Sequence, residues 1–484
     1  MADLPIDRRW EITISDADYR RLMAHLFPGD DDEHGAAIFA GVHVLADRVR
    51  LLVRDVVLAT DGVDHIPGVR GYRMLTAQFV RNQVVRARNE RLIYLSVHNH
   101  GGHDRVAFST DDLASHERGY PTLLDIVKGM PVGALVFAPA AIAGDIWLPD
   151  ETRAALSCAT VLGPRRLVLR PSPISRAGQR TESIYDRQVR LFGNDGQRIL
   201  SGAKVGIVGL GGVGSQLAEL LGRLGVGHFV LIDPQRADFT NLPRLIGARR
   251  ADVLAREDTI RKFGPLRAIF DRLRRRKVDL AARNILRANS AASVDRIFSS
   301  LVQPRSAARL LDCDYIFLAA DEMIARLIFN AIVHQYLIPG IQVGARVVTD
   351  KSTGDVLDVF AVSRPVTPSL GCLWCNSLID PTKLQIEATD PAQARAQDYG
   401  TEAAAPSVVT LNALAAAEAA NTFMFYMTGL AAPESDQAYI RFRPLFRSVT
   451  LDEPRKNEAC PECGLSTQSR FGRGDSAELP TQQR

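Results

Sequence analysis

Two histidines, a serine and an aspartate lie close together in the stretch SVHNHGGHDRVAFSTDD, residues 96–112. The preceding run RLIYLSV predicts a strand, on which residues two apart share a face. His98 and His100 should therefore point the same way at its end and share one metal ion. Ser109 is the expected N-cap of a following helix, which places Asp112 in the first turn. Two imidazoles and one carboxylate would leave the fourth position of a tetrahedral zinc open for water, as in catalytic sites.

A plainer interpretation is that Ser109 and Asp112 only cap a helix while the histidines are polar loop residues. The catalytic interpretation needs one more group, because a zinc-bound water loses its proton near neutral pH and a carboxylate must accept that proton. Glu33, which stands just before an apolar strand, is the candidate.

HxH, Ser-x-x-Asp and an early glutamate together resemble the JAMM/MPN metallopeptidase family, which includes deubiquitinases, over most of residues 1–150. The resemblance implies zinc ligands at His98, His100 and Asp112, a general acid/base at Glu33, and an oxyanion hydrogen-bond donor at Ser109. Eight residues separate His100 from Ser109, one more than is usual in that family, so a bulge is expected in GGHDRV. Family members that have lost catalysis keep the fold, which leaves a non-catalytic docking module as an alternative.

A second candidate site is the stretch AKVGIVGLGGVGSQLAELLGRLGVGHFVLIDP. It predicts a strand, a glycine-rich turn, a helix and a second strand. The turn carries Gly209, Gly211, Gly212 and Gly214, which let the backbone approach phosphates at a helix N-terminus. Asp233 ends the second strand, in the position that hydrogen-bonds a ribose hydroxyl. This pattern fits an NAD dehydrogenase equally well.

Three further segments, YDRQVRLFG, DPQRADFTNLPR and DYIFLAADEMIARLIFN, resemble the ThiF/MoeB and ubiquitin-activating adenylyltransferases over roughly residues 184–466. The resemblance implies ATP- and magnesium-dependent adenylation of the C-terminal glycine of a ubiquitin-like, β-grasp protein. It also implies residue roles: Asn241 and Arg244 on the triphosphate, Lys277 on the phosphates, Asp321 on magnesium, and Arg187 in the partner subunit's site of a homodimer.

Two positions depart from this family pattern. Leu245 replaces the family's glutamine after the arginine. Arg244 and Lys277 are 33 residues apart, further than expected, so Lys262 is a reserve candidate for the lysine.

Four of the six cysteines form two CxxC pairs, Cys372 with Cys375 and Cys460 with Cys463. Such pairs predict one structural zinc site, because four thiolates leave no open coordination position. Two unrelated exposed pairs are the alternative. The two other cysteines, Cys158 and Cys313, are expected to be small buried hydrophobic residues.

The loop DPAQARAQDYGTEAAAPSVV contains no cysteine, although thioester-forming ubiquitin-activating enzymes carry their catalytic cysteine there. Three outcomes remain open. The adenylate passes directly to a partner, it receives sulfur, or a hydroxyl takes the acyl group as an oxyester. Thr401 stands about where the cysteine would be, although a hydroxyl needs a base to activate it.

Length and composition fit a protein of two or three α/β domains. The 484 residues carry a formal net charge of only +4 and lack a signal peptide or an uninterrupted apolar span, so a cytoplasmic protein without nucleic-acid or membrane partners is expected. The expected organisation is a JAMM/MPN-like α/β domain (1–169), a linker (170–183), a doubly wound Rossmann-like adenylation domain with a zinc knuckle (184–466) and a disordered tail (467–484).

The presence of a peptidase-like domain and an adenylation domain in one chain suggests that both act on the same ubiquitin-like protein. The peptidase would trim or release it, and the second domain would activate its exposed carboxylate. Bacterial ubiquitin-like operons carry fusions of this kind, and a conjugating enzyme is a further candidate partner. Activation of a sulfur-carrier protein for cofactor or cysteine biosynthesis is the alternative enzymatic function.

Overall fold

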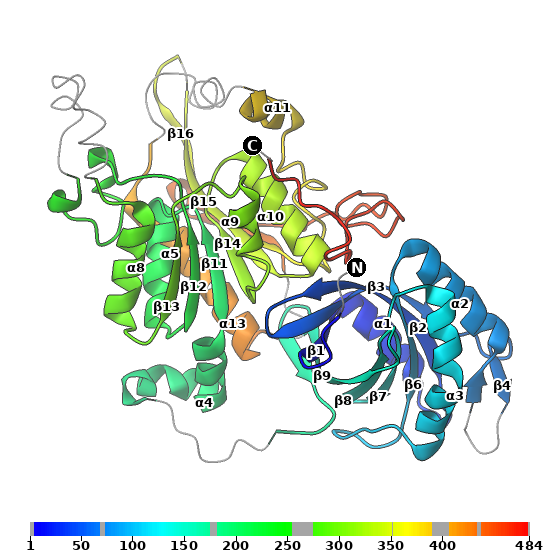
Figure 1. Ribbon diagram of the computed structural model, residues 1–484. Coiled ribbons are helices and arrows are strands. Elements are labelled where there is room, and N and C mark those ends of the chain that lie inside the picture. Colours follow the sequence, from blue (N-terminus) through cyan, green and yellow to red (C-terminus); the bar gives the residue numbers. More distant parts are fainter. Residues whose placement is uncertain are drawn as a thin grey trace. The chain divides into compact units, whose positions relative to one another are not determined.

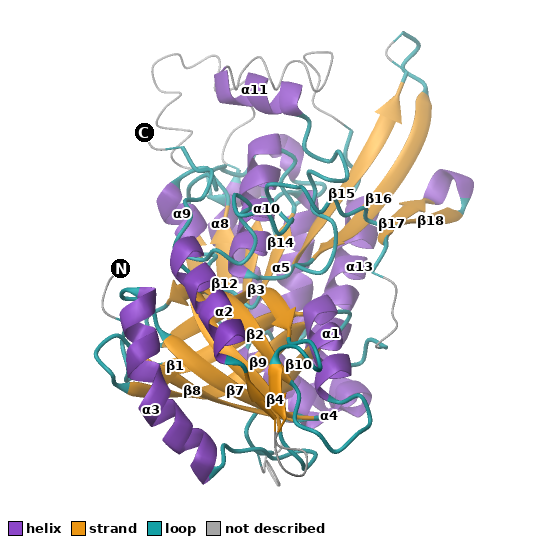
Figure 2. Cartoon of the chain, turned by 90° about the vertical axis from the view of Figure 1, so that its right-hand side faces the viewer, coloured by secondary structure: helices purple, strands orange, loops and turns teal. Residues whose placement is uncertain are grey.

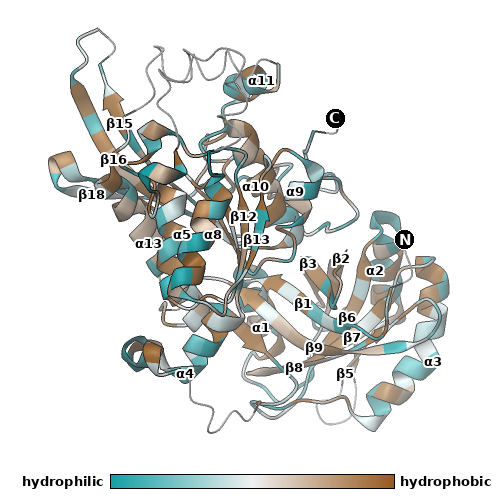
Figure 3. Cartoon of the chain, turned by 60° about the vertical axis from the view of Figure 1, so that its left-hand side comes forward, coloured by the Kyte–Doolittle hydropathy of each residue, from teal (hydrophilic) through white to brown (hydrophobic). Residues whose placement is uncertain are grey.

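The computed structural model describes residues 4–67, 73–174, 182–253, 274–350, 352–389, 406–432 and 437–482. The chain forms two compact units. Unit 1 contains residues 1–178, 334–337 and 457–478, and unit 2 contains the remainder. Within each unit the strands are largely hydrophobic, whereas helices such as α3 also carry hydrophilic segments (Figure 3). No helix among the described residues has the length and apolarity that crossing a bilayer requires.

Unit 1 is built on one sheet with the order β1-β3-β2-β6-β7-β8-β9-β10, and an additional pairing of β1 with β9 closes this order on itself. The strands are β1 (Arg9–Ser15), β2 (Gly35–Val44), β3 (Arg48–Leu58), β6 (Ile93–Asn99), β7 (Val132–Ala138), β8 (Ala141–Trp147), β9 (Arg153–Leu162) and β10 (Arg166–Leu169). A separate short pair consists of β4 (His65–Pro67) and β5 (Arg73–Leu75). The helices are α1 (Asp16–Leu26), α2 (Ala77–Glu90) and α3 (Thr110–Val127) (Figure 1).

The C-terminal segment 457–478 belongs to unit 1, so the prediction of a disordered tail from residue 467 is wrong for the described residues. Ser469 and Phe471 are each only 1% exposed. The buried guanidinium of Arg54 donates hydrogen bonds to the carbonyl oxygens of Ser466, Ser469 and Phe471. The polar composition of this segment predicted disorder. Its backbone carbonyl groups are instead bound by Arg54 on β3, which is far away in the sequence.

Unit 2 is a mixed α/β fold with a Rossmann-like sheet of order β13-β12-β11-β14-β15-β16-β17-β18. Its strands are β11 (Lys204–Val208), β12 (His228–Ile232), β13 (Ser293–Ile297), β14 (Tyr315–Leu318), β15 (Gly340–Thr349), β16 (Val356–Val366), β17 (Tyr439–Arg443) and β18 (Ser448–Asp452). The first five strands in this order, β13, β12, β11, β14 and β15, run parallel to one another. Strands β16, β17 and β18 extend the sheet with antiparallel pairings. Figure 2 shows β15 and β16 as a long antiparallel pair.

The helices of unit 2 are α4 (Asp186–Gly202), α5 (Gly212–Arg223), α8 (Lys277–Ala288), α9 (Pro304–Ala308), α10 (Met323–Tyr336), α11 (Pro381–Thr389) and α13 (Val409–Thr428). The apolar run after Val408 forms α13, a helix with buried residues such as Ala415 and Phe423. Strand order reverses between β11 and β14, because β12 and β13 follow on one side and β15 on the other. Ligands of such sheets bind at this switch point, outside the carboxyl ends of the strands.

Candidate functional sites

The histidine and aspartate side chains of the first candidate site meet at the end of β6. His98 lies on β6 and His100 directly follows it, while Ser109 is the N-cap of α3, as the sequence predicted. Asp112 is in the first turn of that helix. One ligand atom from each of His98, His100 and Asp112 lies within 4.8 Å of the others. The predicted three-residue metal site is therefore brought together in one place.

Distances within this site favour a cation between the three side chains. Nε2 of His98 lies 3.5 Å from Oδ1 of Asp112, and Nε2 of His100 lies 3.3 Å from Oδ2. Glu33, just before β2, places Oε1 3.7 Å from Nε2 of His100. Burial alone would raise the pKa of Asp112, but the adjacent imidazoles of His100 and His98 and the hydroxyl of Ser109 hold it well below its usual range. The carboxylate is therefore charged and able to bind a metal at neutral pH.

The two imidazoles are oriented for metal binding. Nδ1 of His100 is 3.0 Å from the carbonyl oxygen of Ala107, which fixes Nδ1 as the donor and leaves Nε2 as a lone-pair donor to a metal. Nε2 of His98 is buried and lacks a hydrogen-bond partner among the described residues. A buried imidazole nitrogen without a partner costs free energy unless a ligand satisfies it. The residues therefore fit zinc.

The simpler capping interpretation is also correct, because Ser109 and Asp112 form a complete capping box. Oδ2 of Asp112 accepts hydrogen bonds from the backbone N–H of Ser109 at 2.8 Å and from its hydroxyl at 2.7 Å. Oδ1 remains for a metal, so capping and ligation use different oxygens. The hydroxyl proton of Ser109 is directed at Asp112, so the predicted oxyanion role would require this hydroxyl to rotate.

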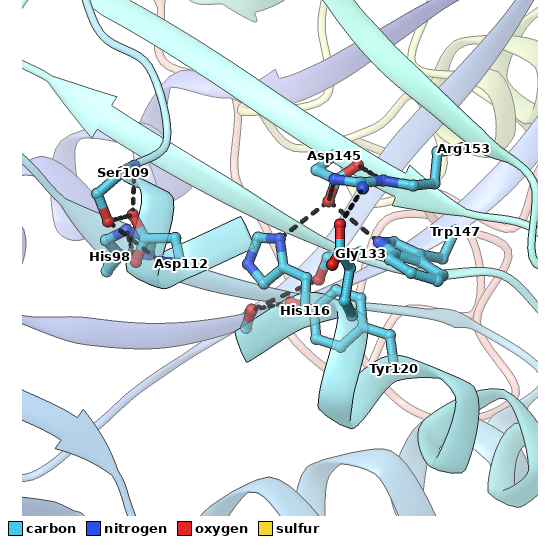
Figure 4. A network of polar contacts seen from close by, with 11 residues as sticks. His98, Ser109, Asp112, His116, Tyr120, Gly133, Asp145, Trp147 and Arg153 are labelled. Atoms are coloured by element: carbon cyan, nitrogen blue, oxygen red, sulfur yellow. Dashed lines mark hydrogen bonds and ion pairs between the residues drawn. The ribbon is translucent and has the colours of Figure 1, made fainter. Parts of the chain in front are cut away.

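A buried polar network continues from this site along α3, and the sequence reasoning missed it (Figure 4). His116 lies one helical turn after Asp112, and its Nδ1 is 2.9 Å from Oδ2 of Asp145 on β8. Asp145 also accepts hydrogen bonds from Trp147 at 3.0 Å and from Arg153 at 2.9 and 3.0 Å. The sequence did contain one signal for this network. His116 follows Asp112 by four residues, which puts both side chains on one face of the helix.

The same helix is anchored to β6 through the hydroxyl of Tyr120. The His116 ring stacks on Tyr120 with centroids 4.7 Å apart, and the Tyr120 hydroxyl lies 2.8 Å from Oγ of Ser96. Ser96 and His98 are two residues apart on β6 and share a face. The network therefore joins the helix that carries Asp112 to the strand that carries His98.

The glycine-rich turn of unit 2 connects β11 with α5, as predicted. Gly209 has φ +84°, and a Cβ there would meet the Ala320 backbone nitrogen at 2.8 Å. A Cβ on Gly214 would meet the carbonyl oxygen of Gly209 at 1.8 Å. Both positions therefore require glycine, Gly209 because the turn lies against Ala319 and Ala320, and Gly214 because the start of the helix lies against the turn. The backbone amides at the start of α5, which has Gly211 as N-cap, can face an anion.

Lys277 lies within electrostatic range of three other predicted site residues, Asp233, Arg244 and Asp321. Its side chain is 7% exposed and donates a hydrogen bond to Oε1 of Gln235. Burial lowers the pKa of Lys277, while the charges of Asp233 and Asp321 raise it and that of Arg244 lowers it further. These charges lie close enough to interact. The spacing of 33 residues from Arg244 therefore does not separate the two cations.

Asp233 is held at the end of β12 by the backbone. Its carboxylate accepts hydrogen bonds from the N–H groups of Leu210 and Gln235, both at 2.7 Å. Burial raises its pKa, and Lys277 opposes this shift. The carboxylate therefore braces the glycine-rich turn and retains lone pairs for a ribose hydroxyl.

The remaining predicted nucleotide residues have simpler surroundings. Asn241 ends a short 3-10 helix, Phe239–Asn241, and accepts a hydrogen bond from the Asp238 N–H at 3.3 Å. Leu245, which departs from the family pattern, is 4% exposed and packs in a small core with Val253 and Leu280. Arg187 is exposed on α4. Lys262 and Thr401 lie outside the described residues.

The two cysteine pairs belong to different units. In unit 2 the Sγ atoms of Cys372 and Cys375 are 3.6 Å apart, and the Cys375 N–H donates to Sγ of Cys372 at 3.4 Å. In unit 1 the Glu462 N–H donates to Sγ of Cys460 at 3.4 Å. Such N–H···S bonds favour the thiolate form that binds metal. Cys158 and Cys313 are buried, as predicted, and burial raises the pKa of both thiols.

Comparison with known proteins identifies the second half of the chain. The ThiF family model matches residues 185–465, more than half of the chain, and the protein belongs to this family. The sulfur carrier protein ThiS adenylyltransferase of Bacillus subtilis is 30% identical over 195 residues, which cover 39% of this chain and 49% of the relative. The tRNA threonylcarbamoyladenosine dehydratase of the same organism is 39% identical over 64 residues, covering 13% and 25% respectively.

Among solved structures, Escherichia coli MccB with ATP is similar at 22% sequence identity and a TM-score of 0.42, over 59% of this chain and 75% of that chain. The chain spans less than a third of the length of the first curated relatives that it matches. The family-model match therefore places a ThiF-family domain in residues 185–465.

Proposed function

We propose that unit 2 uses ATP to adenylate the C-terminal carboxylate of a ubiquitin-like protein. The observation that carries this proposal is the burial of Lys277, which donates a hydrogen bond to Gln235 next to Asp233, the carboxylate that braces the glycine-rich turn. The charges of Arg244 and Asp321 are close enough to influence it. An attacking carboxylate and a triphosphate are both anionic, so cations must neutralise them together. Lys277 and Arg244, with Asn241, would hold the phosphates, and Asp321 would hold the magnesium that bridges them.

Substitution of Lys277 tests this proposal. Lys277→Met should lower ATP–pyrophosphate exchange by at least about a hundredfold, because a cation on the transferring group is lost. The same substitution at Lys204, which pairs with Asp312 at the opposite edge of the sheet, is the matched control. The assay uses a panel of ubiquitin-like proteins that end in glycine. Equal exchange in both variants would refute the assignment, and binding of NADH in place of ATP would favour a dehydrogenase.

We further propose that unit 1 is a zinc metallopeptidase of the JAMM/MPN type that processes the same ubiquitin-like protein. His98, His100 and Asp112 would hold the metal, whose contribution is to make a bound water acidic. Glu33 is within reach to take a proton near His100. Glu33→Gln should abolish cleavage of a C-terminally extended precursor and leave zinc content unchanged. If cleavage is absent in both wild type and variant, unit 1 is a docking module for the ubiquitin-like protein instead.

Three finer proposals concern the metal, the assembly and the product of unit 2. The first is a structural zinc on the four CxxC cysteines. Asn376, next to Cys375, exchanges hydrogen bonds with the backbone of Arg455, which stands five residues before Cys460. The second is a homodimer in which Arg187 reaches the partner's site. The third is the fate of the adenylate, for which an oxyester on Thr401, direct transfer and thiolation remain the alternatives.

The names of several relatives favour one second candidate, a sulfur-carrier function. They include the ThiS adenylyltransferase and the molybdopterin-synthase adenylyltransferase of Escherichia coli, which is 42% identical over 62 residues. Thr401→Val separates the outcomes. Loss of a hydroxide-sensitive, thiol-resistant acyl-enzyme bond would support the oxyester, whereas a thiocarboxylate product formed with a sulfurtransferase would support the sulfur-carrier function.

A further inference from the structure

A row of polar side chains crosses one face of the unit 2 sheet at its carboxyl edge. Leu318 at the end of β14 pairs with Gln342 on β15, and Gln342 pairs with Arg364 on β16. Ser363 on β16 pairs with Ile440 on β17, and the next pair in this antiparallel register is Arg364 with Tyr439. Paired residues on neighbouring strands share a face. The row therefore begins beside β14, which borders the switch point.

Cations dominate this row. Arg364 donates a hydrogen bond to Oε1 of Gln342 at 2.5 Å. Burial lowers the pKa of Arg364 to about 10, and the nearby charges of Arg326 and Arg441 contribute to this shift. The carboxylate that faces them is Asp452, which is 57% exposed and lies 3.8 Å from Nη2 of Arg441. Asp452 is thus paired with Arg441, whereas the largely buried guanidinium of Arg364 is hydrogen-bonded to the neutral amide of Gln342, which leaves a positive potential at the row.

Space is available beside these cations. Gly344 pairs with Val362, which pairs with Arg441, so the three residues form the next row on the same face. A Cβ built on Gly344 would meet only Nε2 of Gln342, at 3.9 Å. Nε of Arg441 is buried and has no hydrogen-bond partner among the described residues. A guanidinium with an unused N–H favours an anionic ligand, because hydrogen bonds between charged groups are stronger than neutral ones.

We propose that Arg364 and Arg441 form a subsite for an acidic side chain in the tail of the adenylated protein or peptide. This inference rests on the adenylation function proposed above and specifies its substrate. Arg364 lies two strands from β14, at about 10 Å, since neighbouring strands are about 4.8 Å apart. An extended chain covers that distance in about three residues. The recognised Asp or Glu therefore stands about three residues before the terminal glycine.

Two synthetic heptapeptides that end in Gly-Gly test the subsite. They differ only at the fourth residue from the end, which is Asp in one and Asn in the other. The full chain should bind the fluorescently labelled Asp peptide about tenfold more tightly, because a charge-assisted hydrogen bond replaces a neutral one. Arg364→Gln should remove this preference, Arg364→Lys should restore part of it, and the KM for ATP should not change. Arg346→Gln, at an exposed position on the same face of β15, is the charge-matched control and should keep the preference.

Several results would overturn the proposal. Equal affinity for the two peptides in wild type, no binding of either peptide at millimolar concentration, or a preference that survives Arg364→Gln would each do so. A raised KM for ATP in Arg364→Gln would assign the cations to nucleotide phosphates instead. Preferential binding of the Asp peptide without any ATP–pyrophosphate exchange would keep the subsite and reject the adenylation function, so the two failures are distinguishable.

Discussion

Oδ2 of Asp112 lies 3.3 Å from Nε2 of His100, while the same carboxylate completes the capping box of α3 with Ser109. A single carboxylate thus stabilises the helix N-terminus and faces the imidazoles. This double use makes the metal site dependent on the position of α3.

Zinc content should separate the two proposed metal sites. We expect about two zinc ions per wild-type chain, about one in His98→Ala/His100→Ala and about one in Cys372→Ser, because the sites use different ligands. Metal analysis of purified full-length protein measures this. One ion in both wild type and the histidine variant would assign all zinc to the cysteines and leave the first site without a metal.

His116 should act as a positioning residue for Asp112. His116→Phe keeps the ring and its stacking on Tyr120 but loses the hydrogen bond to Asp145. We expect zinc at the histidine site to bind about tenfold more weakly, since residues that orient metal ligands typically have effects of this size. Chelator competition measures the affinity. His116→Asn, which can donate a hydrogen bond from a similar position, should recover most of it; equal weakening in both variants would indicate a packing effect only.

Stability at acid pH should depend on Asp145. Burial alone would raise its pKa, but hydrogen bonds from His116, Arg153 and Trp147 hold it below the usual value. In acid the unfolded state therefore binds the proton more readily than the folded state. The stabilisation is present above the unfolded pKa of about 3.9 and is lost as pH falls through the lower folded value.

Asp145→Asn should therefore lower Tm at pH 7 and flatten the decline of Tm between about pH 5 and pH 3. Thermal denaturation followed by circular dichroism measures both effects. Asp125→Asn, which changes an exposed carboxylate on α3, should leave the profile unchanged. A profile for Asp145→Asn that parallels the wild type would contradict the prediction.

Arg54 should hold the C-terminal segment on unit 1. Arg54→Met leaves the buried carbonyl oxygens of Ser466, Ser469 and Phe471 without their donor, which should cost about 2–4 kcal/mol of unfolding free energy. Urea denaturation of the full chain gives the free energy, and limited proteolysis should show faster cleavage within 466–476. Arg88→Met on α2, whose side chain is exposed, is the control. Unchanged stability and proteolysis in Arg54→Met would show that the segment is held by other contacts.

Local sequence determined those parts of both sites that lie within a single strand, helix start or turn. Alternation along β6 put His98 and His100 on one face, and Ser109 capped α3 because its hydroxyl matches the free amides of a first helical turn. Gly209 and Gly214 were recognisable because no side chain fits their close contacts. These features depend on backbone geometry within a few residues, and for that reason the sequence predicts them.

Tertiary structure decided the relationships between distant residues. Lys277 interacts with Arg244 and Asp233 although 33 residues separate the two cations, because parallel strands bring their carboxyl ends to one edge. Asp145 meets His116, and Arg54 binds the segment 466–471, through pairings that no local pattern encodes. A buried charge without a partner costs free energy, so these polar groups pair with one another where they are buried. Burial depends on the assembled fold, and local sequence does not determine it.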